Sequence, residues 1–305
     1  MTPRLKAFTM LRAISSNFIF LNLSFICLRN VKIGSWLLTK EACAALAATI
    51  MTSPVPLSFD ALSSSGSLLL QTLSSLKHQG AAFAAHKALE KICCVCVKFR
   101  SKGNLTNSPH TLPSLWAQDL LSEISMKEKV RDSTLRRSTG IALGFLSIMR
   151  SEPPANVKPT SICPFVLSNL LKLSLPPTSS LYTRFKKLNM TSPEDSFIFQ
   201  NYMKDPEVLF VEDAAYQVRT RVHALNILRL SILDAPLATE MRKFVGDAII
   251  SALIGYKDDS WQVRNSATMV FSAAMLRVVD ADKNASSSEH KATHTPTKVS
   301  LFRSF

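Results

Sequence analysis

The sequence predicts an all-α protein built from repeated pairs of helices. The 305 residues are 47% hydrophobic and include only 8 glycines, so the chain can bury a large core. β-branched residues rarely alternate with polar ones, as half-buried strands would require. Apolar residues recur instead at helical spacing, and one block of sequence repeats at an interval typical of helical arrays.

Short breakers rich in serine, proline and asparagine separate the helical segments. We expect helices over residues 31–51, 58–77, 81–99, 112–126, 134–150, 162–175, 214–233, 236–255 and 260–279. Two segments are too polar to pack and are expected to be mobile loops, at residues 176–196 and 282–298.

The repeated block gives the architecture. QVRTRVHALNILRL at 217–230 aligns without a gap to QVRNSATMVFSAAM at 262–275, which places Asp213 opposite Asp258. A looser third copy is LRRSTGIAL at 135–143. Periods of about 40–47 residues with two helices per unit are typical of HEAT or armadillo arrays. The sequence therefore predicts an α-solenoid of HEAT- or armadillo-like repeats.

Within each copy, apolar side chains at helical spacing predict a buried face. In the later copy these are Val263, Ala267, Val270, Ala274 and Val278, and in the earlier one Val218, Val222, Leu225 and Ile232. Asp259 and Gln262, three residues apart, can form a capping box at the helix start.

The arginines of the repeat have two interpretations, which the sequence leaves open. Arg219 can pair with Asp213, and Arg264 with Asp258, as ion pairs inside the array. Alternatively, polar residues at helical spacing line a concave binding face. The two candidate stripes are Arg264, Asn265, Thr268 and Ser272, and Arg219, His223 and Asn226.

Charge favours a polyanionic partner such as RNA without requiring one. The chain has 36 Lys and Arg against 22 Asp and Glu, a formal net charge of +14. This charge is scattered, and aromatic residues are not interleaved with it, so any RNA contact would use phosphates and shape. Trp116 and Trp261 are expected to pack between helices.

No catalytic or metal-binding pattern is present in the sequence. GxGxxG, Walker A, HExxH and GxSxG motifs are absent, and the cluster Cys93, Cys94 and Cys96 lacks a second pair of ligands. We therefore expect no cofactor, metal or small-molecule substrate. We expect buried, reduced cysteines, which fit an intracellular compartment.

The N-terminus carries a basic, apolar stretch that resembles a signal or a short anchor. The run at 13–28 is broken by Asn17 and Asn22 and is shorter than the ~20 residues that a bilayer-spanning helix needs. We expect an amphipathic or imperfect first helix there and no membrane span; a targeting or membrane-attachment segment is the alternative.

Several motifs resemble those of the thyroid-adenoma-associated (THADA) family. RVHALNILR at 221–229 and GYKDDSWQVRNSATMVFSA at 255–273 are similar to its VHALNILR and W-x-VRNS-[AS]-T-x-LFSAL signatures. LRRSTGIALGFLSIMRSEP at 135–153 resembles its RRSAG-[LI]-P segment, with Thr139 and Ala142 in place of the usual Ala and Pro. CLRNVKIGSWLL at 27–38 and LPSLWAQDLLSEI at 112–124 resemble two further elements.

The resemblance implies a regulatory, non-catalytic protein of the cytoplasm. Family members direct an FtsJ-type methyltransferase to the ribose 2′-hydroxyl at the first position of the tRNA anticodon loop, and the partner enzyme holds the cofactor. The candidate tRNA- or partner-contact residues that the motifs imply are Arg136, Arg137, Ser138, Gly140, His223, Asn226, Arg264, Asn265 and Ser266. Trp116, Asp213, Arg219, Asp258 and Trp261 are expected to be structural.

The expected organisation is an uncertain apolar segment at 1–26, a HEAT-like domain at 27–281 and a flexible segment at 282–305. The resemblance identifies the chain with the central domain of much longer solenoids. A general solenoid scaffold that binds proteins without RNA contact is the alternative function, and it predicts an apolar or acidic groove.

Overall fold

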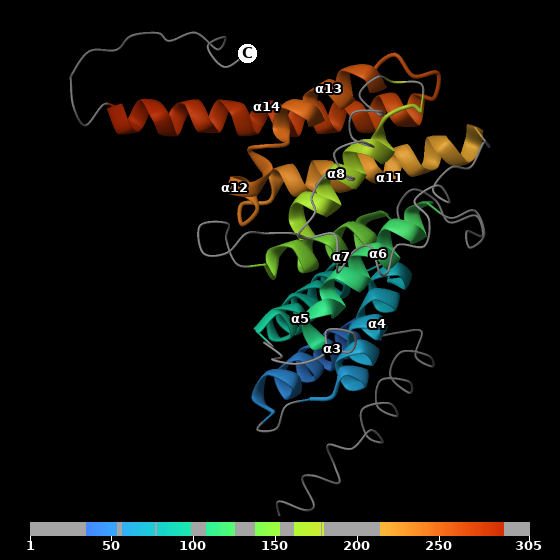
Figure 1. Ribbon diagram of the computed structural model, residues 1–305, viewed down its shortest axis with the longest axis vertical. Helices are drawn as coiled ribbons and strands as arrows, with labels where there is room; N and C mark the ends of the chain where they lie inside the picture. The colour runs from blue at the N-terminus through green and yellow to red at the C-terminus, as the bar shows by residue number, and fades with distance from the viewer. Residues whose placement is uncertain are drawn as a thin grey trace, which may run out of the picture. The chain divides into compact units, whose positions relative to one another are not determined.

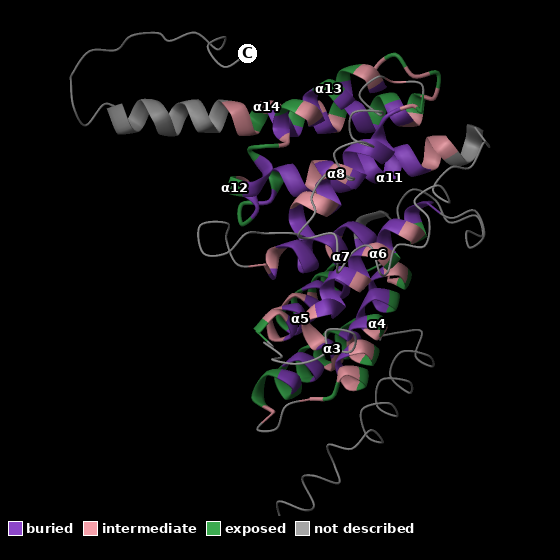
Figure 2. Cartoon of the chain, in the orientation of Figure 1, coloured by how far each residue is buried: buried purple, intermediate pink, exposed green. Residues whose placement is uncertain are grey.

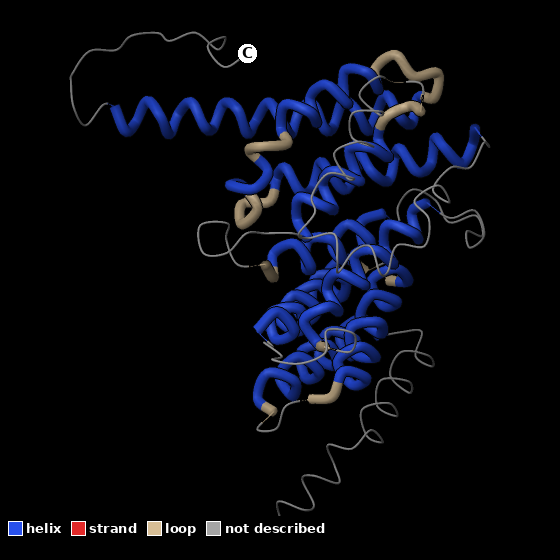
Figure 3. Tube along the Cα trace, viewed as in Figure 1, coloured by secondary structure: helices blue, strands red, loops and turns tan. Residues whose placement is uncertain are grey.

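The computed structural model is all-α, and no strand occurs among the residues that it describes (Figure 3). The structure describes residues 35–53, 57–76, 78–98, 108–125, 138–152, 162–177, 179 and 214–289. The predicted all-α class is confirmed, and the succession of helices is consistent with an α-solenoid of helical repeats. The HEAT or armadillo type of the repeat stays a prediction.

The chain divides into two compact units, residues 1–123 with 129–162 and residues 124–128 with 163–305. In the first unit the helices are α3 (Ser35–Thr52), α4 (Phe59–Ser75), α5 (Gln79–Lys98), the 3-10 turn η2 (Pro109–Thr111), α6 (Leu112–Ser125, whose last two residues belong to the second unit) and α7 (Ser138–Arg150). α5 packs against α3, α4 and α7. At the start of α4, the Ser58 hydroxyl accepts a hydrogen bond from the Ala61 amide at 3.2 Å and so caps the helix.

Two glycines allow close helix contacts in the first unit. A Cβ on Gly66 of α4 would lie 2.0 Å from the indole of Trp116 on α6, and that indole is 2% exposed. A Cβ on Gly140 of α7 would lie 2.0 Å from the carbonyl oxygen of Leu73 on α4. Trp116 is therefore a core residue, as the sequence predicts, and Gly140 is the point where α7 meets the backbone of α4.

The second unit contains α8 (Ile162–Ser174), α11 (Ala214–Leu233), α12 (Ala238–Met241), α13 (Val245–Gly255) and α14 (Trp261–Glu289). α14 packs against both α11 and α13 (Figure 1). Its predicted apolar face is confirmed for Val263, Ala267, Val270 and Ala274, which are 0% exposed, whereas Val278 is half-buried. The absence of a side chain at Gly255 permits this packing, because a Cβ there would lie only 2.8 Å from the Cβ of Ala267. The purple bands of Figure 2 show these buried faces.

Three features of the second unit differ from the sequence prediction. The helix expected over 236–255 is divided into α12 and α13, and the turn Arg242–Phe244 between them is closed by bonds such as Phe244 N–H to the Met241 carbonyl, 2.9 Å. α14 continues to Glu289, into a segment expected to be a loop; its Asn and Ser residues have low helix propensity, but extending a helix that has already begun costs little. Trp261 is 63% exposed, so its predicted packing between helices is wrong.

Four of the five described cysteines are buried, as expected, and Cys94 is half-buried. The thiols of Cys43, Cys93, Cys96 and Cys163 are buried and take part in no disulfide. Burial raises the pKa of the Cys96 thiol to about 12 and that of Cys43 to about 11, which leaves both protonated at neutral pH. No group of three or more metal-ligating side chains occurs in the described ranges.

The remaining expectations about segments concern residues outside the described part of the chain. These are the apolar stretch at 1–26, most of the loop at 176–196 and the end of the chain after Glu289. None of the helices that the structure describes combines the length and apolar character needed to cross a membrane.

Candidate contact surface

An exposed polar face runs along the first half of α14. It is formed by Trp261, Arg264, Asn265, Thr268 and Ser272, which we call the α14 stripe; all five are exposed. The spacing of three and four residues places them on one side of the helix, opposite the apolar face. The stripe predicted from the sequence is therefore exposed. Ser266 lies outside it, because it is only 3% exposed and faces the core.

Arg264 is fixed by the loop before its own helix. Its Nη1 donates to the carbonyl oxygens of Asp258 at 2.7 Å and Asp259 at 2.8 Å. The predicted ion pair with the Asp258 carboxylate is therefore wrong, since Arg264 contacts the backbone of that residue. No other partner of the guanidinium is recorded among the described residues. The two carbonyl oxygens therefore bind one nitrogen of the guanidinium, while the Arg264 side chain is exposed to solvent.

Asp258 is paired instead with Arg221, a residue that the sequence analysis did not single out. The Arg221 Nη1 donates to Asp258 Oδ2, and the two side chains are only 8% and 14% exposed. Arg221 Nε donates to the carbonyl oxygen of Ser174, the last residue of α8, at 3.2 Å. A single guanidinium thus joins α8, α11 and the loop between α13 and α14.

The helix start at this loop also differs from the predicted capping box. α14 begins at Trp261, so Ser260 and not Asp259 occupies the position just before it. The Asp258 carboxylate accepts a hydrogen bond from the Ser260 amide through Oδ1 at 2.9 Å. Asp258 therefore accepts a hydrogen bond within the loop through one oxygen and binds Arg221 through the other.

The second predicted stripe, on α11, does not form an open face. His223 is 6% exposed, and Arg219 and Asn226 are half-buried. Arg219 Nε donates to His223 Nε2 at 3.4 Å, which places the imidazole proton on Nδ1; that atom is buried without a recorded partner in the described structure. Burial, together with the nearby Arg219 charge, lowers the pKa of His223 to about 4.

The buried His223 predicts a pH-dependent stability. In the unfolded chain His223 takes up a proton below about pH 6.5, whereas the folded chain resists protonation until about pH 4. The free energy of unfolding should therefore fall as the pH drops through this window, by up to about 3 kcal/mol. Urea unfolding at several pH values would measure it. A His223→Gln variant should show a smaller slope than the wild type, and an equal slope would contradict the assignment.

A shallow groove of about 440 Å³ lies beside the Arg221–Asp258 pair. Its lining is Pro176, Arg221, Ile250, Leu253, Ile254, Lys257, Asp258 and Asp259. Ile250 and Leu253 of α13 are 40% and 48% exposed, which gives the groove an apolar wall. Lys257 and Asp259 are exposed at its edge.

The motif around residues 135–153 is described only in part. Arg136, Arg137 and Asp213 lie outside the described residues, so the predicted pairing of Arg219 with Asp213 cannot be placed. Ser138 begins α7, and Gly140 is buried against α4. The place of Gly140 in the fold is accounted for by helix packing alone.

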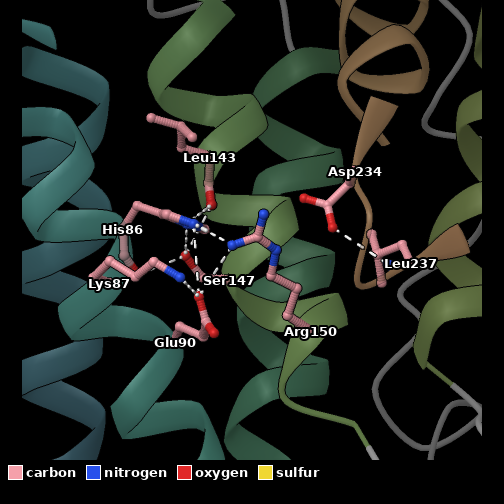
Figure 4. Close-up of polar contacts among 8 residues, drawn as sticks. All are labelled: His86, Lys87, Glu90, Leu143, Ser147, Arg150, Asp234 and Leu237. Atoms are coloured by element: carbon pink, nitrogen blue, oxygen red, sulfur yellow. Dashed lines mark hydrogen bonds and ion pairs between the residues drawn. The ribbon is translucent and has the colours of Figure 1, made fainter. Parts of the chain in front are cut away.

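One cluster in the first unit has the residue types of a hydrolase triad but not the geometry (Figure 4). His86 Nδ1 lies 2.7 Å from Ser147 Oγ and donates to the Leu143 carbonyl at 3.0 Å, while Nε2 accepts from Arg150 Nη1 at 3.0 Å. Arg150 also binds Glu90 at 3.3 Å. Since His86 and Ser147 are both 0% exposed, the hydroxyl cannot reach a substrate. The cluster ties α5 to α7.

Comparison with known proteins identifies the family. A family model described as THADA/TRM732, DUF2428 matches residues 28–262. Proteins named tRNA (32-2'-O)-methyltransferase regulator THADA are similar to the chain. The Homo sapiens protein is 26% identical over 259 residues, which is 83% of this chain and 11% of that one. The Gallus gallus protein is 26% identical over 226 residues, which is 72% of this chain and 9% of that protein. The Drosophila melanogaster protein is 24% identical over 272 residues, which is 82% of this chain and 13% of that protein.

The chain spans about a tenth of the length of these relatives. No solved structure matches it. The family model covers well over half of the chain. The chain therefore belongs to the THADA/TRM732 family, DUF2428.

Proposed function

We propose that this chain is a tRNA-contacting domain of a non-catalytic regulator of tRNA 2′-O-methylation. The observation that carries the proposal is the family match over residues 28–262, together with relatives that are named regulators of tRNA (32-2'-O)-methyltransferase. The methyl group goes to the ribose at the first position of the anticodon loop. The cofactor and the catalytic residues lie on an FtsJ-type partner enzyme.

The surface of the second unit supports an RNA contact. The α14 stripe carries an arginine, an amide and two hydroxyl groups but no carboxylate, and the chain as a whole has a net charge of +14. The guanidinium and the amide can donate to phosphate and ribose oxygens without reading sequence. The hydroxyls of Thr268 and Ser272 already donate to the carbonyls of Arg264 and Thr268, each at 2.9 Å, and can accept hydrogen bonds from a ribose. On this proposal the stripe helps to hold the tRNA while the partner enzyme acts on it.

Arg136 and Arg137 give the first test. A full-length family member carrying this domain is placed in cells that lack their own, and 2′-O-methylation of the anticodon-loop ribose is measured. Replacing both arginines with alanine should reduce methylation at least about tenfold, because each charged contact to phosphate contributes on the order of 1 kcal/mol or more. Protein abundance must remain unchanged.

A matched control is the pair Arg242→Ala and Lys243→Ala, two adjacent basic residues exposed at the turn after α12. This variant removes the same charge and should leave methylation within about twofold of the wild type. Full methylation by the Arg136→Ala, Arg137→Ala variant would reject these residues as contacts. Equal loss in both variants would indicate a dependence on overall charge only.

The groove beside α13 supports a second candidate function, a scaffold that binds protein and not RNA. Its apolar wall, Ile250 and Leu253, is the kind of surface that a partner helix covers. If the chain is a scaffold alone, replacing both residues with serine should abolish partner binding, while the Arg136→Ala, Arg137→Ala variant should have no effect on methylation.

A further inference from the structure

Trp261 is the most exposed large hydrophobic side chain in the described structure. It is 63% exposed at the first position of α14, and no ring contact is recorded for its indole within the described ranges. A solvent-facing indole offers a flat π surface of the kind on which unpaired bases stack. The buried Trp116, at 2% exposed, and Trp36, stacked on His78 at 4.5 Å, offer no comparable open surface.

Arg264 lies one turn from Trp261 with its orientation already set. Its Nη1 is engaged by the two loop carbonyls at 2.7 and 2.8 Å, so the guanidinium is fixed before any ligand arrives. The exposed side chain retains N–H groups that can donate to a phosphate. Fixing a donor in advance reduces the entropy lost on binding.

Asn265 completes the arrangement. It is exposed, four residues after Trp261 and therefore on the same side of the helix. Its amide carries donors and an acceptor, the pair of functions that recognises the hydrogen-bonding edge of a base. No hydrogen bond of this side chain is recorded in the described part of the chain.

We propose that Trp261, Arg264 and Asn265 form a subsite for one unpaired nucleotide of an RNA. The base stacks on the Trp261 indole, the Asn265 amide binds the base edge, and the anchored Arg264 binds the adjoining phosphate. This inference rests on the proposed tRNA contact and deepens it, because it specifies a single-stranded segment as the ligand at α14.

The surroundings favour RNA over a protein helix as the occupant. A helix in a groove requires apolar anchors at successive turns. On this face Trp261 is followed by Asn265, Thr268 and Ser272, and the next large apolar side chain, Leu276, is about 22 Å further along the helix. The exposed carboxylate of Asp259 precedes the helix, but none lies on the stripe itself. A single exposed aromatic side chain beside an arginine of fixed orientation is therefore better suited to bind a nucleotide than a protein helix.

Tryptophan fluorescence of the 305-residue chain tests the subsite. Titration with a single-stranded oligoadenylate should quench the indole emission, while a duplex of the same length should quench it much less. Trp261→Phe should abolish this quenching yet bind with an affinity within about threefold of the wild type, because a phenyl ring still stacks. Trp261→Leu should weaken binding about tenfold or more.

Trp36→Phe is the matched control, since it removes another partly exposed indole and should retain both quenching and affinity. Unchanged oligoadenylate affinity in Trp261→Leu, with tRNA still bound by the wild type, would overturn the subsite alone. Failure of the wild type to bind tRNA or oligoadenylate would contradict both the subsite and the proposed function. Loss of methyltransferase binding with intact RNA affinity in Trp261→Leu would assign this face to protein docking and overturn the subsite.

Discussion

Replacing Arg221 with alanine is expected to lower the free energy of unfolding by about 3–5 kcal/mol. The substitution leaves the Asp258 carboxylate, 14% exposed, without its counter-ion, and it removes the donor that satisfies the last carbonyl of α8. Chemical denaturation, followed by circular dichroism, would measure the change. The effect should appear in the transition of the second unit.

Two variants separate the ion pair from a general loss of charge. Lys257→Ala removes an exposed lysine close to the same loop and should change stability by less than about 0.5 kcal/mol. Combining Arg221→Met with Asp258→Leu replaces the whole pair by apolar groups and should restore part of the lost stability. A decrease below about 1 kcal/mol in Arg221→Ala would contradict the proposed role of Arg221 in joining three elements.

Replacing Gly140 with alanine is expected to destabilise the first unit by about 3 kcal/mol. The added methyl group would lie 2.0 Å from the carbonyl oxygen of Leu73. Backbone cannot rotate away as a flexible side chain can, so α7 must shift from α4. Thermal unfolding would measure the loss. The outcome bears on function, because Gly140 belongs to the motif expected to contact tRNA or a partner.

Gly246→Ala provides the matched control for this prediction. A Cβ at Gly246, near the start of α13, would meet nothing within 4 Å apart from its chain neighbours and its own helix backbone, so alanine should stabilise the helix by about 0.5–1 kcal/mol. If Gly140→Ala folds with wild-type stability but fails to support methylation, the packing account of Gly140 is wrong and a direct contact role gains support.

The helices could be predicted from the sequence because their apolar periodicity is strong. The predicted segments 58–77 and 81–99 correspond to α4 and α5 with shifts of one or two residues. The break within 236–255 was missed, since a turn of three residues barely interrupts the apolar spacing. The extension of α14 to Glu289 was missed because composition alone does not show where a helix already formed will stop.

The ion pairs could not be predicted because sequence repeats fix which positions are equivalent but not which side chain faces a neighbour. Alignment of the copies singled out Arg219, yet Arg221 contacts Asp258. Two residues along a helix rotate a side chain by about 200°, so the choice depends on how α11 packs against its neighbours.

The helical spacing of the sequence contains a pattern from which the exposure of Trp261 could have been predicted. Large aromatic residues are usually buried on average, and this expectation decided the prediction. Helical spacing, however, places Trp261 in line with Asn265, Thr268 and Ser272, the residues already assigned to a polar stripe. Giving the spacing more weight than the residue type would have placed Trp261 at the surface.

Crosslinking of tRNA to a full-length family member bound to its methyltransferase tests the central claim most directly. Ultraviolet crosslinking followed by mass spectrometry identifies the peptides that touch the RNA. A tRNA-contacting domain predicts crosslinked peptides from the start of α14, around Trp261 and Asn265, and from the segment with Arg136 and Arg137. Crosslinks confined to regions outside the part of the protein that corresponds to residues 28–289, in a complex that still methylates tRNA, would contradict it.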